Sequence, residues 1–248
     1  MNRDATGLAG VRHRHYDTLG STNAEALALA RAGERGPLWI TAKTQTAGRG
    51  RRGNSWVSEP GNLFATLLLS EPLPPALAPQ LSFVAALALH DAVSEAAPQL
   101  AQTLCLKWPN DLLLGGKKLA GILIEGDSDK TFAVAIGIGV NSASHPAETQ
   151  HPATDLAVAG VRIAPERLFE PLVPAMERRL GQWCAGQGFA SIRADWLKRA
   201  GGLGEQIRVR LRERELSGVF EGLDDSGRLL LKTESGVTTV TAGEVFGL

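Results

Sequence analysis

Cysteine, net charge and long apolar runs are all scarce in this chain of 248 residues. Its two cysteines, Cys105 and Cys184, lie in apolar stretches without CxxC spacing, which favours a reducing, cytoplasmic setting. The 26 Lys and Arg residues balance 26 Asp and Glu residues, so no overall field would hold a polyanion such as DNA. Any anion that the protein binds must therefore be held by a local group of residues.

The chain also shows no segment that would direct it to a membrane or an organelle. No uninterrupted apolar run of 18 residues occurs, and residues 11–16 lack the amphipathic, Arg- and Ser-rich pattern of a transit peptide. Hydrophobic residues nevertheless make up 44% of the sequence. At this length they can bury one sizeable core and a small satellite domain, so we expect a globular protein that needs no membrane.

Strand-like segments outnumber helical ones before residue 200. The strand patterns are short and aliphatic, and they comprise a segment ending near Leu19 and residues 38–44, 62–70, 104–108, 119–125 and 132–140. The helical patterns comprise residues 22–31, 80–97, 165–184 and 189–200. A T-x-x-E capping box at Thr22 and Glu25 marks the start of the first helix.

Glycines mark a hairpin and a domain boundary. Gly115 and Gly116 predict a tight turn, which would place Asp111 and Lys118 on adjoining antiparallel strands. Glycines at 201, 202 and 204 end the last helical pattern, and short alternating strands follow. We therefore predict an α+β fold: a mixed, mainly antiparallel sheet with helices in residues 1–200, and a small β-barrel in residues 201–248.

The loop after residue 45 is the most unusual segment of the sequence. Residues 46–56 place three arginines among three glycines, so that guanidinium and backbone N–H groups can converge on phosphate oxygens. A solvated basic loop or an RG-rich nucleic-acid contact would have the same composition. The surrounding strands and the zero net charge weaken the nucleic-acid alternative.

A second polar segment, Lys107-Trp108-Pro109-Asn110-Asp111, ends a predicted strand and precedes the hairpin to Lys118. Taken singly, Asn110 and Asp111 read as ordinary turn residues, and Lys118 reads as a solvated strand lysine. They become informative only together with the arginine loop.

Four segments in this order resemble the biotin protein ligases: residues 21–23 (Ser-Thr-Asn), 48–53 (GRGRRG), 107–111 (KWPND) and 118–123 (KLAGIL). The resemblance implies a class II synthetase-like catalytic domain with an SH3-like C-terminal barrel that closes over nucleotide or carrier. It also implies an enzyme that uses ATP and Mg²⁺ to form biotinyl-5'-AMP. Biotin then passes to a lysine of the biotin carboxyl carrier protein of acetyl-CoA carboxylase.

The same resemblance implies roles for individual residues. The biotin site would comprise Ser21, Thr22, Asn23 and Gln45 around the ureido ring, together with Gly48, Arg49, Gly50, Arg51, Lys118 and Gly121. The ATP site would comprise Arg49, Arg51, Trp56, Asn110, Lys118 and Asn141. The residues given catalytic roles are Arg51, Lys118 and Asp111, and no metal ligand is assigned.

These roles have a chemical rationale. When a carboxylate attacks the α-phosphorus of ATP, negative charge meets negative charge, so positioned Arg and Lys groups offset the repulsion. In the second step a neutral acceptor lysine must attack the adenylate, and Asp111 would either orient it or accept its proton. The chain departs from the family at two places: Asn54 stands where many members have a basic residue, and no aromatic residue lies between Asn141 and Arg162 to stack on adenine. The sequence therefore does not assign the residue that contacts adenine.

Other functions fit part of the pattern. A lipoate or octanoate ligase shares the fold class, but the Ser-Thr-Asn and Gln45 set favours a polar ureido ring. A non-catalytic biotin or nucleotide sensor, or an RNA-binding protein, would not need Lys118 and Asp111. Only 20 residues precede Ser21, too few for the DNA-binding domain of some members, so we expect no operator binding. Monomer and homodimer both stay open.

Overall fold

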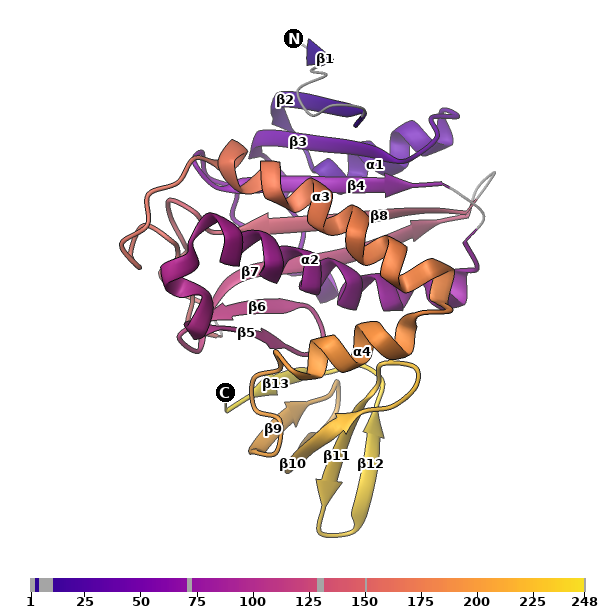
Figure 1. The fold of residues 1–248 in the computed structure, drawn as a ribbon, viewed down its shortest axis with the longest axis vertical. Helices are drawn as coiled ribbons and strands as arrows, with labels where there is room; N and C mark the ends of the chain where they lie inside the picture. The colour runs from indigo at the N-terminus through magenta and orange to yellow at the C-terminus, as the bar shows by residue number, and fades with distance from the viewer. Residues whose placement is uncertain (1–2, 5–10, 71–72, 129–131, 150, 248) are drawn as a thin grey trace.

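The computed structural model describes residues 3–4, 11–70, 73–128, 132–149 and 151–247 (Figure 1). Its larger part is an eight-stranded sheet of order β1-β2-β3-β4-β8-β7-β6-β5, in which β2 and β3 are parallel and the other neighbouring pairs antiparallel. The strands are β1 (Arg3–Asp4), β2 (His13–Leu19), β3 (Leu38–Gln45), β4 (Leu63–Leu69), β5 (Leu104–Lys107), β6 (Asp111–Leu114), β7 (Lys117–Asp127) and β8 (Ala133–Val140). The predicted mixed, mainly antiparallel sheet is confirmed.

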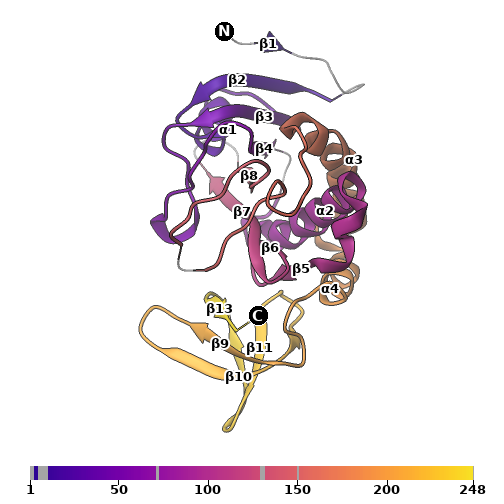
Figure 2. The ribbon, with the colours of Figure 1, turned by 90° about the vertical axis from the view of Figure 1, so that its left-hand side faces the viewer.

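Helices cover both faces of this sheet (Figures 1 and 2). They are α1 (Thr22–Arg31), α2 (Leu81–Ala96), α3 (Pro165–Trp183) and α4 (Phe189–Leu197). The side chains of β4 alternate between the two faces: Leu67 packs in the core with α2 and α3, whereas Leu68 packs with α1. Two apolar cores therefore hold one sheet between two helical layers.

The first helix begins one residue earlier than the capping-box pattern predicts. Ser21, with extended backbone, is its N-cap, and its hydroxyl accepts from the Ala24 N–H at 3.5 Å. Thr22 is already helical, and its N–H and hydroxyl both donate to the Gln45 side chain. The predicted cap at Thr22 is therefore wrong, because Ser and Thr both act as N-caps and the T-x-x-E pattern does not by itself decide between adjacent positions.

The C-terminal strands form a separate five-stranded antiparallel sheet of order β12-β11-β10-β9-β13, which fits the predicted SH3-like domain. The strands are β9 (Gln206–Arg210), β10 (Glu215–Leu223), β11 (Leu229–Thr233), β12 (Gly236–Val240) and β13 (Glu244–Phe246). This domain lies beside α4 and the edge strand β5 (Figure 1).

The turn between β10 and β11 docks the small domain onto the larger part. The indole N–H of Trp108 donates to the carbonyl oxygen of Gly227 at 3.0 Å. A Cβ atom at position 227 would lie 2.8 Å from the ring of Phe83 and 3.1 Å from that of Phe189, so only glycine fits at this contact. The tryptophan of the predicted ligand-site motif therefore also anchors the second domain.

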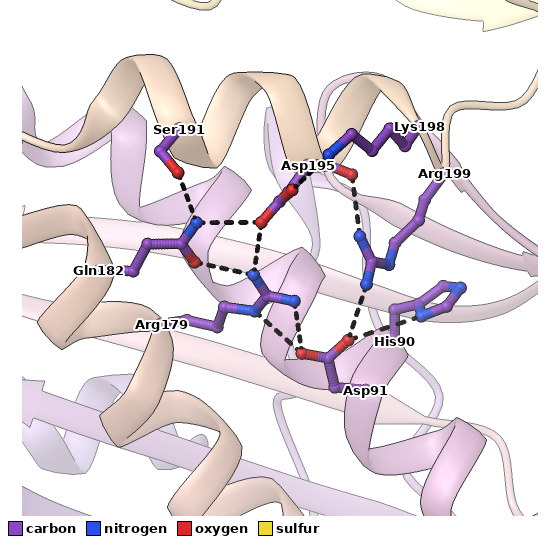
Figure 3. A network of polar contacts seen from close by, with 8 residues as sticks. All are labelled: His90, Asp91, Arg179, Gln182, Ser191, Asp195, Lys198 and Arg199. Carbon is purple, nitrogen blue, oxygen red and sulfur yellow. Dashed lines mark hydrogen bonds and ion pairs between the residues drawn. The ribbon is translucent and has the colours of Figure 1, made fainter.

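A polar network joins α2, α3 and α4 (Figure 3). The guanidinium of Arg179 lies 2.7 Å from Asp91 and 2.9 Å from Asp195. A hydrogen bond from Gln182, together with Lys198 and Arg179, outweighs the effect of burial and lowers the pKa of Asp195 to about 2. The network fixes the helix that leads into the small domain.

The stretch Pro75–Ala96 has the length and composition of a membrane span. Its most apolar window of 18 residues has a mean hydropathy of 1.4, but 61% of that window is buried inside the structure. The sequence predicts no candidate membrane span, because no uninterrupted apolar run of 18 residues occurs. A buried core helix passes the same test, and α2 contacts both the sheet and α3. The stretch is therefore weak evidence for a membrane.

Candidate functional site

A cavity of about 390 Å³ brings together segments that are far apart in the sequence. It is lined by parts of residues 21–23, 45–57, 107–111, 118–123, 137–141, 146–153 and 243–245. All four motif segments of the sequence contribute to it. The cavity is therefore the candidate site, and its chemistry follows from how each segment is held.

The start of α1 and the end of β3 form a buried polar cluster. The side-chain oxygen of Gln45 accepts from the backbone N–H of Thr22 at 2.9 Å and from its hydroxyl at 3.1 Å. The Gln45 amide donates to Ser58 at 2.9 Å. The hydroxyl of Thr66 lies 2.7 Å from both the Thr22 hydroxyl and the Asn23 amide oxygen. These hydrogen bonds join the start of α1 to β3 and β4.

Asn23 reaches from α1 across to the strands of the sheet. Its amide donates to the Leu123 carbonyl at 3.2 Å and to the Glu125 carboxylate at 2.9 Å. A Cβ atom at position 137 would lie 2.3 Å from the Asn23 side-chain oxygen. Gly137 of the G-x-G segment is therefore required by packing against this asparagine.

The arginine loop turns back on itself, and its arginines line one cavity with different partners. The Gly50 N–H donates to the Asn54 carbonyl at 2.7 Å across the turn. Arg49 pairs with Glu125 at 2.9 Å, and Arg51 donates to the Asn110 side-chain oxygen at 3.1 Å. Burial, and next the charge of neighbouring Arg52, lower the pKa of Arg51 from its ordinary value. Two of the loop arginines are thus fixed at the cavity wall.

A carboxylate between two lysines lies at one side of the cavity. Asp111 is 6% exposed, and its oxygens lie 2.7 Å from Nζ of Lys118 and 3.4 Å from Nζ of Lys107. Burial raises the pKa of Asp111, but the two ammonium groups outweigh it, so the pKa lies below its ordinary value. Burial lowers the pKa of Lys107, against the effect of Asp111. The hairpin places Asp111 and Lys118 on adjoining antiparallel strands, as predicted, and the pairing of β5 with β6 brings Lys107 to the same carboxylate.

A pair of glycines forms a flat surface beneath Trp56. Gly121 on β7 pairs with Gly139 on β8. A Cβ atom would lie 2.6 Å from the Trp56 ring at position 139 and 3.0 Å from it at position 121. Nζ of Lys118 lies 5.5 Å from the ring centroid. The indole N–H of Trp56 is buried without a hydrogen-bond partner among the described residues.

Almost all of the predicted site residues meet at this cavity. Those that line it are Ser21, Thr22, Asn23, Gln45, Arg49, Gly50, Arg51, Trp56, Asn110, Asp111, Lys118, Gly121 and Asn141. The exception is Gly48, which is buried behind the wall, where a Cβ atom would lie 2.5 Å from the Trp56 carbonyl oxygen. The packing of the loop requires glycine at position 48, and the ligand roles of all these residues, Gly48 included, stay predictions.

Sequence reasoning expected the small domain to close over the site but did not identify the residues that reach the cavity. Glu244 of β13 lines the cavity, and its carboxylate lies 2.6 Å from the His151 ring nitrogen. The His151 ring stacks on Phe246 at 4.3 Å between centroids. Burial, and next the charge of Lys107, lower the pKa of His151 although Glu244 opposes them. No local signal links positions 93 residues apart, so the pattern alone could not find this contact.

The described residues offer no preformed metal centre. They contain no group of three or more His, Cys, Asp or Glu side chains placed to hold an ion. Both oxygens of Asp111, the most buried carboxylate of the cavity, face lysines. The protein side chains thus do not fit a dedicated metal site, and we assign no step to a metal.

Comparison with known proteins gives a consistent result. Residues 21–141 match the biotin/lipoate A/B protein ligase family, and residues 202–247 match the biotin protein ligase C terminal domain. A biotin--[acetyl-CoA-carboxylase] ligase of Paracoccus denitrificans is 47% identical over 91% of this chain and 96% of its own length. A bifunctional ligase/repressor of Bacillus subtilis is 32% identical over 97% of this chain and 75% of its own length.

Solved structures show the same likeness. A biotin protein ligase from Aquifex aeolicus in complex with biotin and ATP has a TM-score of 0.80 at 26% identity, covering 94% of this chain and 97% of that one. A biotin protein ligase from Leishmania major in complex with biotinyl-5-AMP has a TM-score of 0.64 at 27% identity, covering 93% and 98%. The similarity thus spans both sheets of the molecule.

Proposed function

The chain belongs to the biotin protein ligase family, and from this premise we propose that it is an ATP-dependent ligase that forms biotinyl-5'-AMP and transfers biotin to a carrier lysine. The observation that carries the proposal is the convergence of Arg49, Arg51 and Lys118 on one cavity that also contains the polar cluster at the start of α1. The carrier that we propose is the biotin carboxyl carrier protein of acetyl-CoA carboxylase, because the name of the similar Paracoccus enzyme gives acetyl-CoA carboxylase as its substrate.

We assign the polar cluster to the ureido ring of biotin. A ureido ring offers two N–H donors and a carbonyl acceptor, and a buried polar group binds tightly only where these are matched. Ser21, Thr22 and Gln45 supply hydroxyl and amide groups at one end of the cavity. An aliphatic lipoyl or octanoyl chain offers no hydrogen bond to the remaining donor and acceptor positions of those groups, which supports biotin over lipoate.

The cations support the first half-reaction. A biotin carboxylate oxygen forms a bond to the α-phosphorus, the bond from that phosphorus to the bridging oxygen breaks, and pyrophosphate leaves with the electron pair. Arg49, Arg51 and Lys118 are positioned to offset the charge that builds up on the phosphoryl oxygens. This chemistry requires no nucleophilic side chain.

In the second half-reaction, Asp111 is better suited to orienting the acceptor than to accepting its proton. The acceptor amine attacks the acyl carbon, the bond from that carbon to the phosphate oxygen breaks, AMP leaves with the electron pair, and the amine releases a proton to water. Lys118 and Lys107 hold the pKa of Asp111 low despite its burial, and a carboxylate with a lowered pKa is a weak base. Its charge can still attract and align an incoming lysine.

Several finer points belong to the proposal. Trp56, Asn110 and Asn141 line the cavity and are our candidates for the adenosine part, with Trp56 offering an aromatic face that residues 141–162 lack. Magnesium and a cytoplasmic location stay predictions. The division at residue 200 is likewise proposed, and it is supported by two separate sheets and by family matches that end at 141 and begin at 202.

Pyrophosphate exchange into ATP tests the substrate assignment. The purified protein is incubated with ATP and labelled pyrophosphate, separately with biotin, lipoate and octanoate. We expect exchange with biotin alone, because only biotin matches the polar cluster. Exchange with lipoate or octanoate but not with biotin would contradict the proposal, and binding without any exchange would indicate a non-catalytic sensor.

A further inference from the structure

Glu125 on β7 connects two parts of the site that are far apart in the sequence. Its Oε2 atom accepts a hydrogen bond from the Asn23 amide at 2.9 Å and lies 2.9 Å from Nη2 of Arg49. Asn23 belongs to the polar cluster at the start of α1, and Arg49 belongs to the arginine loop. One carboxylate oxygen therefore joins the two ends of the site.

The bond to Glu125 completes the hydrogen bonding of Asn23. The amide nitrogen has two hydrogens; one is directed at the Leu123 carbonyl at 3.2 Å and the other at Glu125. Asn23 is only 3% exposed, so the loss of either acceptor would leave a buried donor unpaired. The position of Asn23 thus depends on where the Glu125 carboxylate lies.

Arg49 depends on the same carboxylate from the side of the solvent. Its side chain is 44% exposed, and within the described part of the chain Glu125 is the one carboxylate that pairs with it. An ion pair at this exposure contributes little to stability. It does, however, restrict the rotamers of a long side chain on a glycine-rich loop. The effect of the pair is therefore on the position of the guanidinium.

We propose that Glu125 is a positioning residue that couples binding at the polar cluster to binding at the arginine loop. The inference rests on the proposed function, which assigns the first to biotin and the second to ATP. A ligand that fixes Asn23 also fixes the Glu125 carboxylate, and through it Arg49. Because coupling between two sites is reciprocal, each ligand then tightens the binding of the other by the same factor.

Calorimetric titration with α,β-methylene-ATP measures this coupling, because that analogue cannot release pyrophosphate. We expect saturating biotin to tighten its binding to the wild type by roughly tenfold. Glu125→Gln keeps an acceptor for Asn23 but removes the charge that holds Arg49, so its factor should fall below about twofold. The matched control is Glu170→Gln, which removes a 3.0 Å pair with Arg167 on α3 and should keep the wild-type factor.

The outcomes are distinguishable. A coupling factor in Glu125→Gln equal to that of the wild type would overturn the proposal, and so would a wild type without coupling. A wild type that binds no biotin would instead contradict the proposed function. Thermal unfolding of each variant is measured first; if Glu125→Gln does not fold, Glu125→Asp, which keeps the charge but draws the carboxylate back from Asn23 and Arg49, replaces it and must lose the coupling.

Discussion

Two ion clusters among the described residues, one between helices and one beside the cavity, have opposite arrangements of charge. In the helical cluster a cation lies between two carboxylates: Arg179 is 2.7 Å from Asp91 and 2.9 Å from Asp195 (Figure 3). Arg199 adds a second cation, 3.4 Å from Asp91. Each charge therefore has partners of opposite sign within the protein.

In the cavity cluster a carboxylate lies between two cations. Asp111 pairs with Lys118 and Lys107, and Arg51 stands nearby with an amide partner, Asn110, that carries no charge. Burying a charge without a full counter-charge costs free energy. In the helical cluster the additional cation, Lys198, is 71% exposed to solvent, whereas Lys107 beside the cavity is only 6% exposed. We infer from this comparison that the helical cluster stabilises the fold and that the cavity cluster binds an anionic ligand.

The largest expected effect is on the cavity side. Lys118→Ala removes a preorganised cation, so we expect adenylation to slow by about a hundredfold, or roughly 3 kcal/mol of barrier. Lys107 still pairs with Asp111 in this variant, and the protein should remain folded. Pyrophosphate exchange measures the rate, and a value within about twofold of wild type would remove Lys118 from the reacting centre.

The helical cluster should respond in the opposite way. Asp91→Ala leaves Arg179 and Arg199 with fewer acceptors, so we expect the free energy of unfolding to fall by about 2 kcal/mol. The exchange rate per folded molecule should stay unchanged. Urea unfolding provides the measurement, with Asp17→Asn at the exposed pair to Lys43 as a control. If Asp91→Ala abolished exchange in a stably folded protein, the division between the two clusters would not hold.

A smaller effect is expected at the cavity wall. Arg51→Gln removes one charge-assisted contact to the phosphoryl oxygens of biotinyl-5'-AMP, so this intermediate should leave about tenfold faster before transfer. Arg212→Gln makes the same change at an exposed position of the small domain and serves as the control. Release is followed by filtration of the preformed complex, and unaltered retention in Arg51→Gln would argue against the role.

The smallest expected effect is a pH dependence of stability. The pKa of Asp195 falls from 3.8 to about 2 on folding, so the unfolded chain binds its proton more readily. Its contribution to stability is therefore present above about pH 4 and is lost as the pH falls toward its folded pKa. It should amount to less than about 1 kcal/mol, because Asp195 is near the surface. In Asp195→Asn the free energy of unfolding should fall less steeply between about pH 4 and 2 than in the wild type. An unchanged slope would contradict the lowered pKa of Asp195.

Local patterns predicted much of the site. The Gly115–Gly116 turn, with positive φ at both residues, sets the β6–β7 register and hence the Asp111–Lys118 pair. The prediction failed where adjacent residues are chemically alike, as at the cap between Ser21 and Thr22.

The sequence by itself determined the elements, the order of the motifs and the presence of unusual cations on a glycine-rich loop, because turns and strands follow from short-range sterics and hydrophobic period. Only the tertiary structure decided that Glu125 joins Asn23 to Arg49, and that Glu244 of the small domain reaches His151 beside the cavity. Such contacts join residues about a hundred positions apart in the chain, and they form only when the elements that carry them pack together. Local sequence preferences act over a few residues and cannot predict them.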